Sequence, residues 1–388
     1  MLKSVKIEHF RGFKSFELQQ LGRINLLVGE NNSGKTSILE AIQLLCSRTN
    51  LEPLGEIMIN RGEYFWNDNL RGERELDICH LFHGHEFQVD SKFLISGIND
   101  DVKEDLSITI GESESNIESD ANVLNVLNNL DEKLKEKIIK DLSNGIKSIY
   151  FRVSWHLGKE RPEILNLHLS DNYCLDLKYI KHSNRDKKNK APRIIFINSS
   201  SFNTAKMTEL FDEVVLNPEE ELVTEALRII DNKIERIAPA NVQKASQRMR
   251  LSSAESHTGF FVRLADSKQR VPIGSMGDGI WRILGIILAT VCAKDGYLFI
   301  DEIDTGLHFT TMSDMWKMIW QTAKRLNVQV FATTHNSDCW KSLADIAEQE
   351  DTTEDGIRIH RIEKGKEKSI VFTEPQMVIA AERELEVR

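Results

Sequence analysis

Close to its N-terminus the chain carries the stretch Gly29-Glu30-Asn31-Asn32-Ser33-Gly34-Lys35-Thr36. The apolar run Ile24 to Val28 precedes it, and residues 36–45 follow with the apolar spacing of a helix. Strand, loop and helix occur in the order required by the pattern G-x-x-x-x-G-K-[ST], in which backbone N–H groups cradle phosphate oxygens. We expect Lys35 to reach the β- and γ-phosphates and Thr36 to offer its hydroxyl to Mg²⁺. The stretch predicts a nucleoside triphosphate site.

A second element lies in the last third of the chain, where the apolar run Leu298 to Ile300 ends in the carboxylates Asp301 and Glu302. Asp301 is placed to hold the Mg²⁺ shell, and Glu302 to orient or deprotonate an attacking water. An acidic turn after a strand is common by itself. Together with the upstream lysine loop it predicts hydrolysis of the bound nucleotide.

Two weaker signals flank this carboxylate pair. Ser275 and Gly277 stand directly before an apolar helix that is expected over 280–293, and a hydroxyl and an amide at a helix N-terminus can bind an anion. Downstream, the apolar strand expected over 328–332 leads to His335, whose imidazole could hydrogen-bond a γ-phosphate. The alternatives are an ordinary helix cap and an ordinary histidine at a strand end.

Composition limits the class of protein. The 388 residues exceed the usual size of a single core, and a net charge of -10 argues against a surface coated with basic residues for nucleic acid. The five scattered cysteines form no C-x-x-C pair, so the sequence suggests neither disulfides nor a zinc site. The N-terminus lacks the apolar core of a signal peptide, and the longest apolar run is too short to cross a bilayer. We expect a cytoplasmic protein without membrane contact.

Several stretches resemble the ABC-type ATPase superfamily, and within it the branch of RecF-like and OLD (overcoming lysogenization defect)-like proteins. They are Ile7-Glu8-His9-Phe10-Arg11-Gly12-Phe13-Lys14-Ser15-Phe16, Leu27 through Ser37, Asp301-Glu302-Ile303-Asp304-Thr305-Gly306-Leu307-His308 and Ala332-Thr333-Thr334-His335-Asn336. The resemblance implies ATP and Mg²⁺ as ligands. It implies catalytic roles for Lys35, Glu302 and His335, metal ligation by Thr36 and Asp301, and nucleotide contacts from Gly29, Glu30, Asn31, Asn32, Ser33, Gly34, Lys35, Thr36, Ser37, Arg11, Ser275 and Gly277.

The fold class expected from this resemblance is α/β, an ABC-type P-loop core whose mixed central sheet is flanked by helices. We expect residues 1–50 to form its first part, 51–270 an inserted lobe of strands and helices, and 271–388 its second part. Within the lobe, strands are expected near 76–81, 87–96, 149–155, 163–169 and 193–198, and helices near 121–142 and 219–237. The resemblance provides no clear position for the Q-loop glutamine of this superfamily, and the signature at Ser275 is degenerate.

The resemblance also implies a homodimer or higher homo-oligomer, because the signature of one subunit covers the γ-phosphate bound by another. The roughly 50 residues after His335 are too few for the Toprim nuclease domain of OLD-like proteins, so we expect a separate effector protein, as in two-gene anti-phage systems. One alternative is a RecF-like ATPase that clamps DNA, with Lys181 to Arg193 and the patch Lys244, Arg248 and Arg250 as phosphate contacts or simply solvated loops. A second alternative is an ATP-bound scaffold with little turnover.

Overall fold

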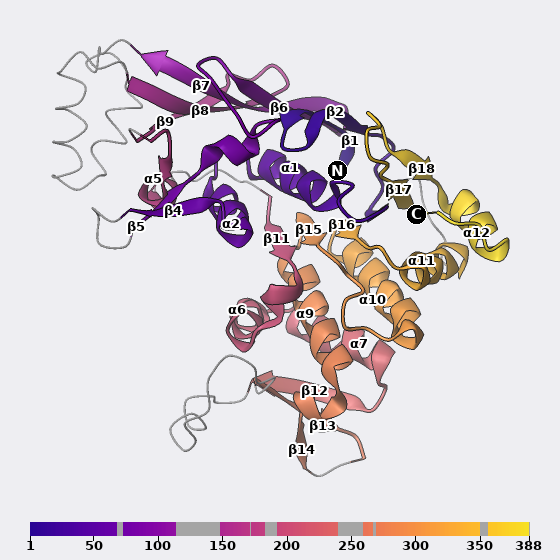
Figure 1. Ribbon diagram of the computed structural model, residues 1–388. Helices are drawn as coiled ribbons and strands as arrows, with labels where there is room; N and C mark the ends of the chain where they lie inside the picture. The colour runs from indigo at the N-terminus through magenta and orange to yellow at the C-terminus, as the bar shows by residue number, and fades with distance from the viewer. Residues whose placement is uncertain are drawn as a thin grey trace. The chain divides into compact units, whose positions relative to one another are not determined.

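The computed structural model describes residues 1–67, 73–113, 148–170, 172–182, 192–239, 259–266, 269–349 and 356–387 (Figure 1). The chain forms two compact units. The first contains Met1 with residues 20–39 and 192–388, and the second contains residues 2–19 and 40–191. Three predicted features lie outside the described residues: the helix over 121–142, most of the basic run from Lys181, and the patch Lys244, Arg248 and Arg250.

The first unit is built on a six-stranded sheet of order β11-β15-β16-β3-β17-β18. Five of these strands are parallel, and β18 pairs antiparallel with β17, so the predicted mixed central sheet is confirmed. The strands, in sheet order, are β11 (Ile194–Ile197), β15 (Tyr297–Ile300), β16 (Gln329–Thr333), β3 (Ile24–Val28), β17 (Ile357–Arg361) and β18 (Ile370–Phe372).

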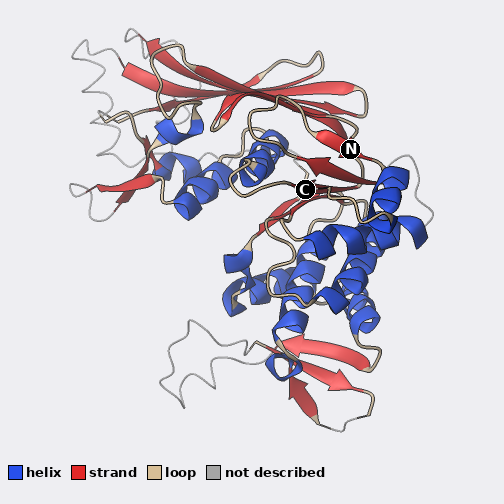
Figure 2. Ribbon diagram, turned by 45° about the vertical axis from the view of Figure 1, so that its right-hand side comes forward, coloured by secondary structure: helices blue, strands red, loops and turns tan. Residues whose placement is uncertain are grey.

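Helices of the first unit pack on this sheet and form its core (Figure 2). The side chains of Trp316, Trp320 and Trp340 are fully buried there, which removes a large apolar area from water. The helices are α6 (Thr204–Val214), α7 (Glu220–Ile230), α9 (Asp278–Cys292), α10 (Met312–Arg325), α11 (Ser337–Gln349) and α12 (Glu374–Glu382). A small antiparallel sheet joins β12 (Ile234–Pro239), β13 (Phe260–Leu264) and β14 (Arg270–Pro272).

The second unit contains a six-stranded antiparallel sheet of order β2-β1-β6-β7-β8-β9. Its strands are β1 (Leu2–Phe10), β2 (Phe13–Leu18), β6 (Lys92–Asn99), β7 (Val102–Ser113), β8 (Ser148–Leu157) and β9 (Glu163–His168). A three-stranded sheet joins β10 (Leu175–Asp176), β5 (Glu73–Leu76) and β4 (Tyr64–Asn67), beside α2 (Glu52–Arg61) and α5 (Leu177–His182). The helix α1 (Lys35–Ser47) begins in the first unit and ends in the second.

The units divide the chain at other positions than the boundaries expected at 50 and 270. The chain returns to the first unit near residue 192 because β11 pairs in parallel with β15. Likewise residues 2–19 belong with the second unit because β1 pairs with β6. Two local expectations are corrected. Residues 76–81 form the end of β5 and a 3-10 turn, η1 (Ile78–Leu81), instead of one strand.

The helix expected over 219–237 ends at Ile230 and gives way to β12. The sequence misled here because Ile234 and Ile237, three residues apart, continue the helical spacing. In the structure both side chains are buried in a strand. A register irregularity between Ile234 and Arg236 lets two residues at that spacing face the same core.

A close backbone approach at the start of β15 gives a test of the sheet. A Cβ added to Gly296 would lie 2.0 Å from the carbonyl oxygen of Arg193, which also accepts a hydrogen bond from the amide of Tyr297. Backbone cannot move aside as a flexible side chain can, so we expect Gly296→Ala to lower the free energy of unfolding by about 1–3 kcal/mol. Chemical denaturation measures this. Gly12→Ala, whose Cβ meets nothing within 4 Å, should change stability little, and equal losses in both variants would contradict the packing argument.

Candidate nucleotide-binding site

The loop between β3 and α1 has the backbone shape of a phosphate cradle. Gly29 has φ +146°, and a Cβ there would lie 2.4 Å from the carbonyl oxygen of Ile362. Gly34 has φ +97°, so both glycines adopt conformations that other residues rarely reach. The hydroxyl of Ser33 is buried and has no hydrogen-bond partner among the described residues. The loop therefore has an unsatisfied polar group where an oxygen-rich ligand would bind.

Lys35 is the first residue of α1, and its ammonium lies over this loop. Its Nζ donates to the carbonyl oxygens of Gly29 at 2.7 Å and Glu30 at 2.8 Å. Burial lowers the pKa of Lys35, while the nearby Asp301 and Glu302 act to raise it. The cation is therefore held beside the glycine loop, within the same unit as the two carboxylates.

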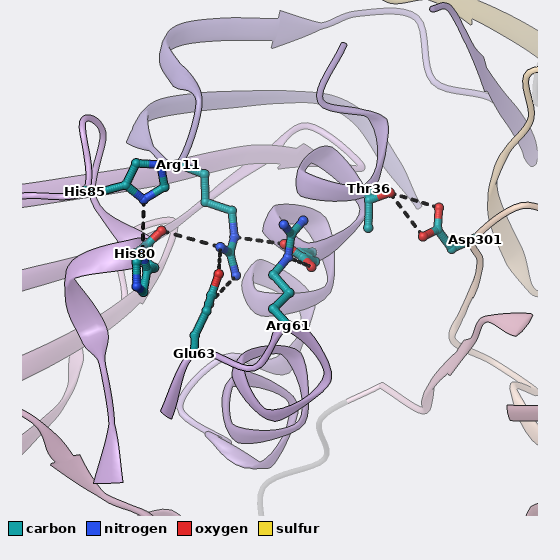
Figure 3. Close-up of polar contacts among 8 residues, drawn as sticks. Arg11, Thr36, Arg61, Glu63, His80, His85 and Asp301 are labelled. Carbon is teal, nitrogen blue, oxygen red and sulfur yellow. Dashed lines mark hydrogen bonds and ion pairs between the residues drawn. The ribbon is translucent and has the colours of Figure 1, made fainter. Parts of the chain in front are cut away.

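Thr36 and Asp301 lie side by side, although 265 positions separate them in the sequence (Figure 3). The Thr36 hydroxyl is 3.0 and 3.1 Å from the two carboxylate oxygens of Asp301. Thr333, at the end of β16, donates its hydroxyl to Asp301 at 2.6 Å. These oxygens suit Mg²⁺, which takes one or two protein oxygens and keeps several waters. Thr36 and Asp301 would hold such an ion, and Thr333 would orient Asp301.

Glu302 stands at a turn with the left-handed φ of +53°, unusual for a residue with a side chain. Two contacts hold this backbone: the Glu302 amide donates to the Thr333 hydroxyl at 2.8 Å, and Arg282 donates to the Glu302 carbonyl at 2.7 Å. The side chain is exposed, and one carboxylate oxygen accepts from the Thr305 hydroxyl at 3.3 Å. The turn thus presents a carboxylate to solvent directly after Asp301.

The predicted His335 lies next to the phosphate loop. Gly29, Glu30, Asn31, His335 and Glu386 line one hollow of the first unit. Ser275 and Gly277, in and after the short turn η4 (Ile273–Met276), are exposed and do not line that hollow among the described residues. Within one chain, the structure therefore brings His335 to the loop and leaves the signature residues facing solvent.

Arg11 lies in a buried ionic cluster of the second unit (Figure 3). Its Nε is 2.9 Å from Glu40, and its Nη1 is 2.6 Å from Glu63. Arg61 binds the other Glu40 oxygen at 2.6 Å. Burial raises the pKa of Glu40, against the lowering influence of Arg11 and Arg61. Since Arg11 is 4% exposed and bound to two carboxylates, its predicted contact with nucleotide stays a prediction.

Three residues near this site were not predicted. Thr333 orients Asp301, Arg282 holds the Glu302 turn, and Glu386 lines the hollow beside the loop. Thr333 had a signal, since it ends the strand that leads to His335. Arg282 lies within an apolar helix, and Glu386 lies in a charged C-terminal stretch, so no sequence pattern indicated a role for either residue.

A lysine-bearing glycine loop whose threonine meets a strand-end aspartate defines a P-loop nucleoside triphosphatase. The family model described as "AAA ATPase domain" matches residues 1–339. The chain belongs to this family and is an ATPase.

Individual proteins are similar to this chain over segments of different length. An ATP/GTP phosphatase of Helicobacter pylori (strain ATCC 700392 / 26695) is 24% identical over 367 residues, which cover 90% of each chain. The DNA replication and repair protein RecF of Clostridioides difficile (strain 630) is 48% identical over 44 residues, 11% of this chain and 12% of that protein. Among solved structures, the SMC head bound to the C-terminal winged-helix domain of ScpA has a TM-score of 0.46 at 12% identity, over 96% of this chain and 97% of that one.

Among the described residues, the structure contains no helix with the length and apolar character needed to cross a membrane.

The contact between Thr36 and Asp301 predicts the effect of removing one charge. We expect Asp301→Asn to keep the fold and to reduce Mg²⁺-dependent ATP hydrolysis by about 10²–10³-fold, because the amide no longer balances a divalent cation. Phosphate release measured across Mg²⁺ concentrations checks this. Asp314→Asn, on α10, serves as the matched control. An Asp301→Asn enzyme with the wild-type Mg²⁺ response would contradict the assignment.

The cluster around Arg11 predicts a large loss of stability. Glu40→Ala leaves the buried Arg11 guanidinium with one carboxylate fewer and should cost about 3–5 kcal/mol, as removal of one partner from a buried ion pair does. Glu8→Ala removes a surface partner of Lys6 in the same unit and should cost no more than about 1 kcal/mol. Denaturant unfolding compares the two, and similar losses would show that burial of the cluster carries no special energy.

Proposed function

We propose that this chain hydrolyses ATP with Mg²⁺ and that ATP controls its association with a second copy. The observation that carries the first part is the contact of Thr36 with Asp301, because it joins the phosphate loop to the acidic strand end. Mg²⁺ held there would neutralise charge on the β- and γ-phosphates. Lys35 would add its ammonium to the same phosphates once they displace the loop carbonyls that it now binds.

Glu302 is the proposed general base. Its exposed carboxylate would accept a proton from water as the water oxygen attacks the γ-phosphorus and ADP leaves. His335, beside Gly29 and Asn31, would hydrogen-bond a γ-phosphate oxygen. Arg282 and Thr333 act through the backbone of Glu302 and fix the direction of its side chain.

Replacing the proposed base separates binding from turnover. Glu302→Gln keeps the side-chain volume and removes the proton acceptor, so we expect ATP binding close to wild type and turnover lower by about 10²–10⁴-fold. Binding of a fluorescent ATP analogue and phosphate release measure the two. GTP should be assayed in parallel, since the Helicobacter relative is named an ATP/GTP phosphatase.

The matched control for this variant is Glu221→Gln, an exposed carboxyl on α7. If Glu302→Gln turns over ATP as fast as Glu221→Gln, Glu302 is not the base. If the wild-type chain binds ATP without measurable turnover, the alternative of an ATP-bound scaffold gains support.

The second part of the proposal concerns the shared site. Ser275 and Gly277 are exposed at the N-terminus of α9 and are not among the residues that line the hollow beside the phosphate loop. We propose that these residues of one copy bind the γ-phosphate held by another copy. ATP would then add contacts to both copies, and hydrolysis would remove the group on which those contacts depend.

A charge and volume change at the signature tests this association. In the Glu302→Gln background with ATP and Mg²⁺, we expect a dimer by light scattering. Adding Ser275→Arg should leave ATP binding to the monomer intact and abolish the dimer, because a long side chain would occupy the interface. A dimer that persists with Ser275→Arg, or forms equally without ATP, would contradict the shared site.

We further propose that the ATP-dependent dimer acts on a separate effector protein in anti-phage defence. Support comes from the resemblance of the motifs to the OLD-like branch, and from the net charge of -10, which favours protein partners over a phosphate backbone. The competing role is a DNA clamp, favoured by the local similarity to RecF. A titration with duplex DNA across salt concentrations distinguishes them: strong, salt-dependent binding favours the clamp, and no binding favours the effector.

A further inference from the structure

A cluster of metal-type donors lies in the second unit and includes none of the residues assigned to the nucleotide. Asp77, Cys79 and His80 follow β5 on the turn η1. One ligand atom from each residue, a carboxylate oxygen, a thiol sulfur and an imidazole nitrogen, lies within 4.8 Å of the others. Oxygen, sulfur and nitrogen atoms at this spacing need only small movements to meet one ion at zinc distances of about 2.0–2.3 Å.

The backbone of the turn fixes two of these donors. Asp77 is the N-cap of η1, and its Oδ1 accepts from the amide of Cys79 at 3.3 Å. The other oxygen of the same carboxylate, Oδ2, is 3.3 Å from Nε2 of His80. One carboxylate thus spans the turn, with one oxygen on the backbone and the other among the donors.

His80 has the arrangement typical of a metal-binding histidine. Its Nε2 faces Asp77, and its Nδ1 lies 3.1 Å from Nδ1 of His85 (Figure 3). Histidine ligands commonly donate their second N–H to a neighbouring acceptor, which fixes the tautomer and the ring orientation. In the tautomer in which His80 donates its Nδ1 proton to His85, the lone pair of His80 Nε2 is directed at the other donors, and a cation there would contact both this nitrogen and the Asp77 carboxylate.

We propose that Asp77, Cys79 and His80 form a zinc site with His85 as the supporting residue. Mixed nitrogen and sulfur donors favour zinc over Mg²⁺, which prefers oxygen ligands, so this site and the phosphate loop would select different ions. The three side chains are only partly buried, which leaves a fourth ligand position for water. Sequence patterns did not predict this site, because its single thiol is not part of a C-x-x-C pair.

The site would fasten the turn to the end of β1. Arg11 donates its amide to the Leu81 carbonyl at 2.9 Å, and His83 donates its amide to the His9 carbonyl at 2.9 Å. An ion bound by residues 77–80 would stabilise the segment that makes these bonds. Its role would therefore be structural and independent of ATP turnover.

Cobalt and zinc binding to the full chain test the proposal without nucleotide. The reduced protein is stripped with a chelator and titrated with Co²⁺, whose bond to a thiolate gives an intense charge-transfer absorption. We expect that absorption at one equivalent and its loss on adding Zn²⁺. Absence of the absorption in the wild-type chain would overturn the proposal by itself, whatever the variants do.

Variants then identify the ligands. Cys79→Ser should remove the absorption, and Asp77→Asn and His80→Ala should abolish stoichiometric zinc binding. His85→Ala should weaken zinc by about 10–100-fold, as loss of a supporting partner does. Cys46→Ser, which replaces a buried thiol of the same unit outside the cluster, should bind Co²⁺ as wild type does. Circular dichroism confirms that each variant is folded, and a folded Cys79→Ser variant that keeps the absorption would refute the site.

Discussion

The parallel register of β3, β16 and β15 is the constraint on which the site depends. Leu27 pairs with Thr333, and Ala332 pairs with Ile300, so all three strands end at one edge of the sheet. The glycine loop, His335 and Asp301 follow those ends directly. Bringing together segments separated by more than 250 residues costs several kcal/mol of chain entropy, which grows only slowly with length. Burial of the strands on the α9–α11 side of the sheet offsets it, because Leu26, Ile300 and Val330 are fully buried.

Hydrogen bonds at the same edge of the sheet orient the carboxylates of Asp301 and Glu302. Thr333 contacts both acidic positions, donating its hydroxyl to Asp301 and accepting from the amide of Glu302. The left-handed turn at Glu302 costs about 1–3 kcal/mol for a residue with a side chain, and the bonds from Thr333 and Arg282 maintain it. As a result, the two adjacent carboxylates point in different directions: Asp301 is turned toward Thr36, and Glu302 is turned toward solvent. An uninterrupted strand would point adjacent side chains to opposite faces without fixing either.

The sequence was informative where function needs a fixed local pattern. The loop from Gly29 to Thr36 could be located because glycines and a lysine at that spacing have few other uses, and the common acidic pair Asp301–Glu302 gained its meaning from that loop. The sequence was uninformative where the fold depends on pairing between strands that are far apart in the chain. Strand β11 belongs with β15, and β1 with β6, which no local pattern indicates. At Ile234 and Ile237 the apolar spacing even led to a wrong prediction, because an irregular strand there has the spacing of a helix. The metal-type donors at Asp77 to His80 were likewise invisible, since a turn, and not a motif, brings them together.

The helix α1 carries both the threonine that contacts Asp301 and the glutamate of the buried ionic cluster. Thr36, next to Asp301, and Glu40, bound by Arg11 and Arg61, are four residues apart and lie on one face of the helix. A rotation of α1 that withdraws Thr36 from Asp301 would also move Glu40, and moving Glu40 would deprive the buried Arg11 of one of its two carboxylate partners. The ionic cluster therefore resists changes in the orientation of the helix that begins at the phosphate loop.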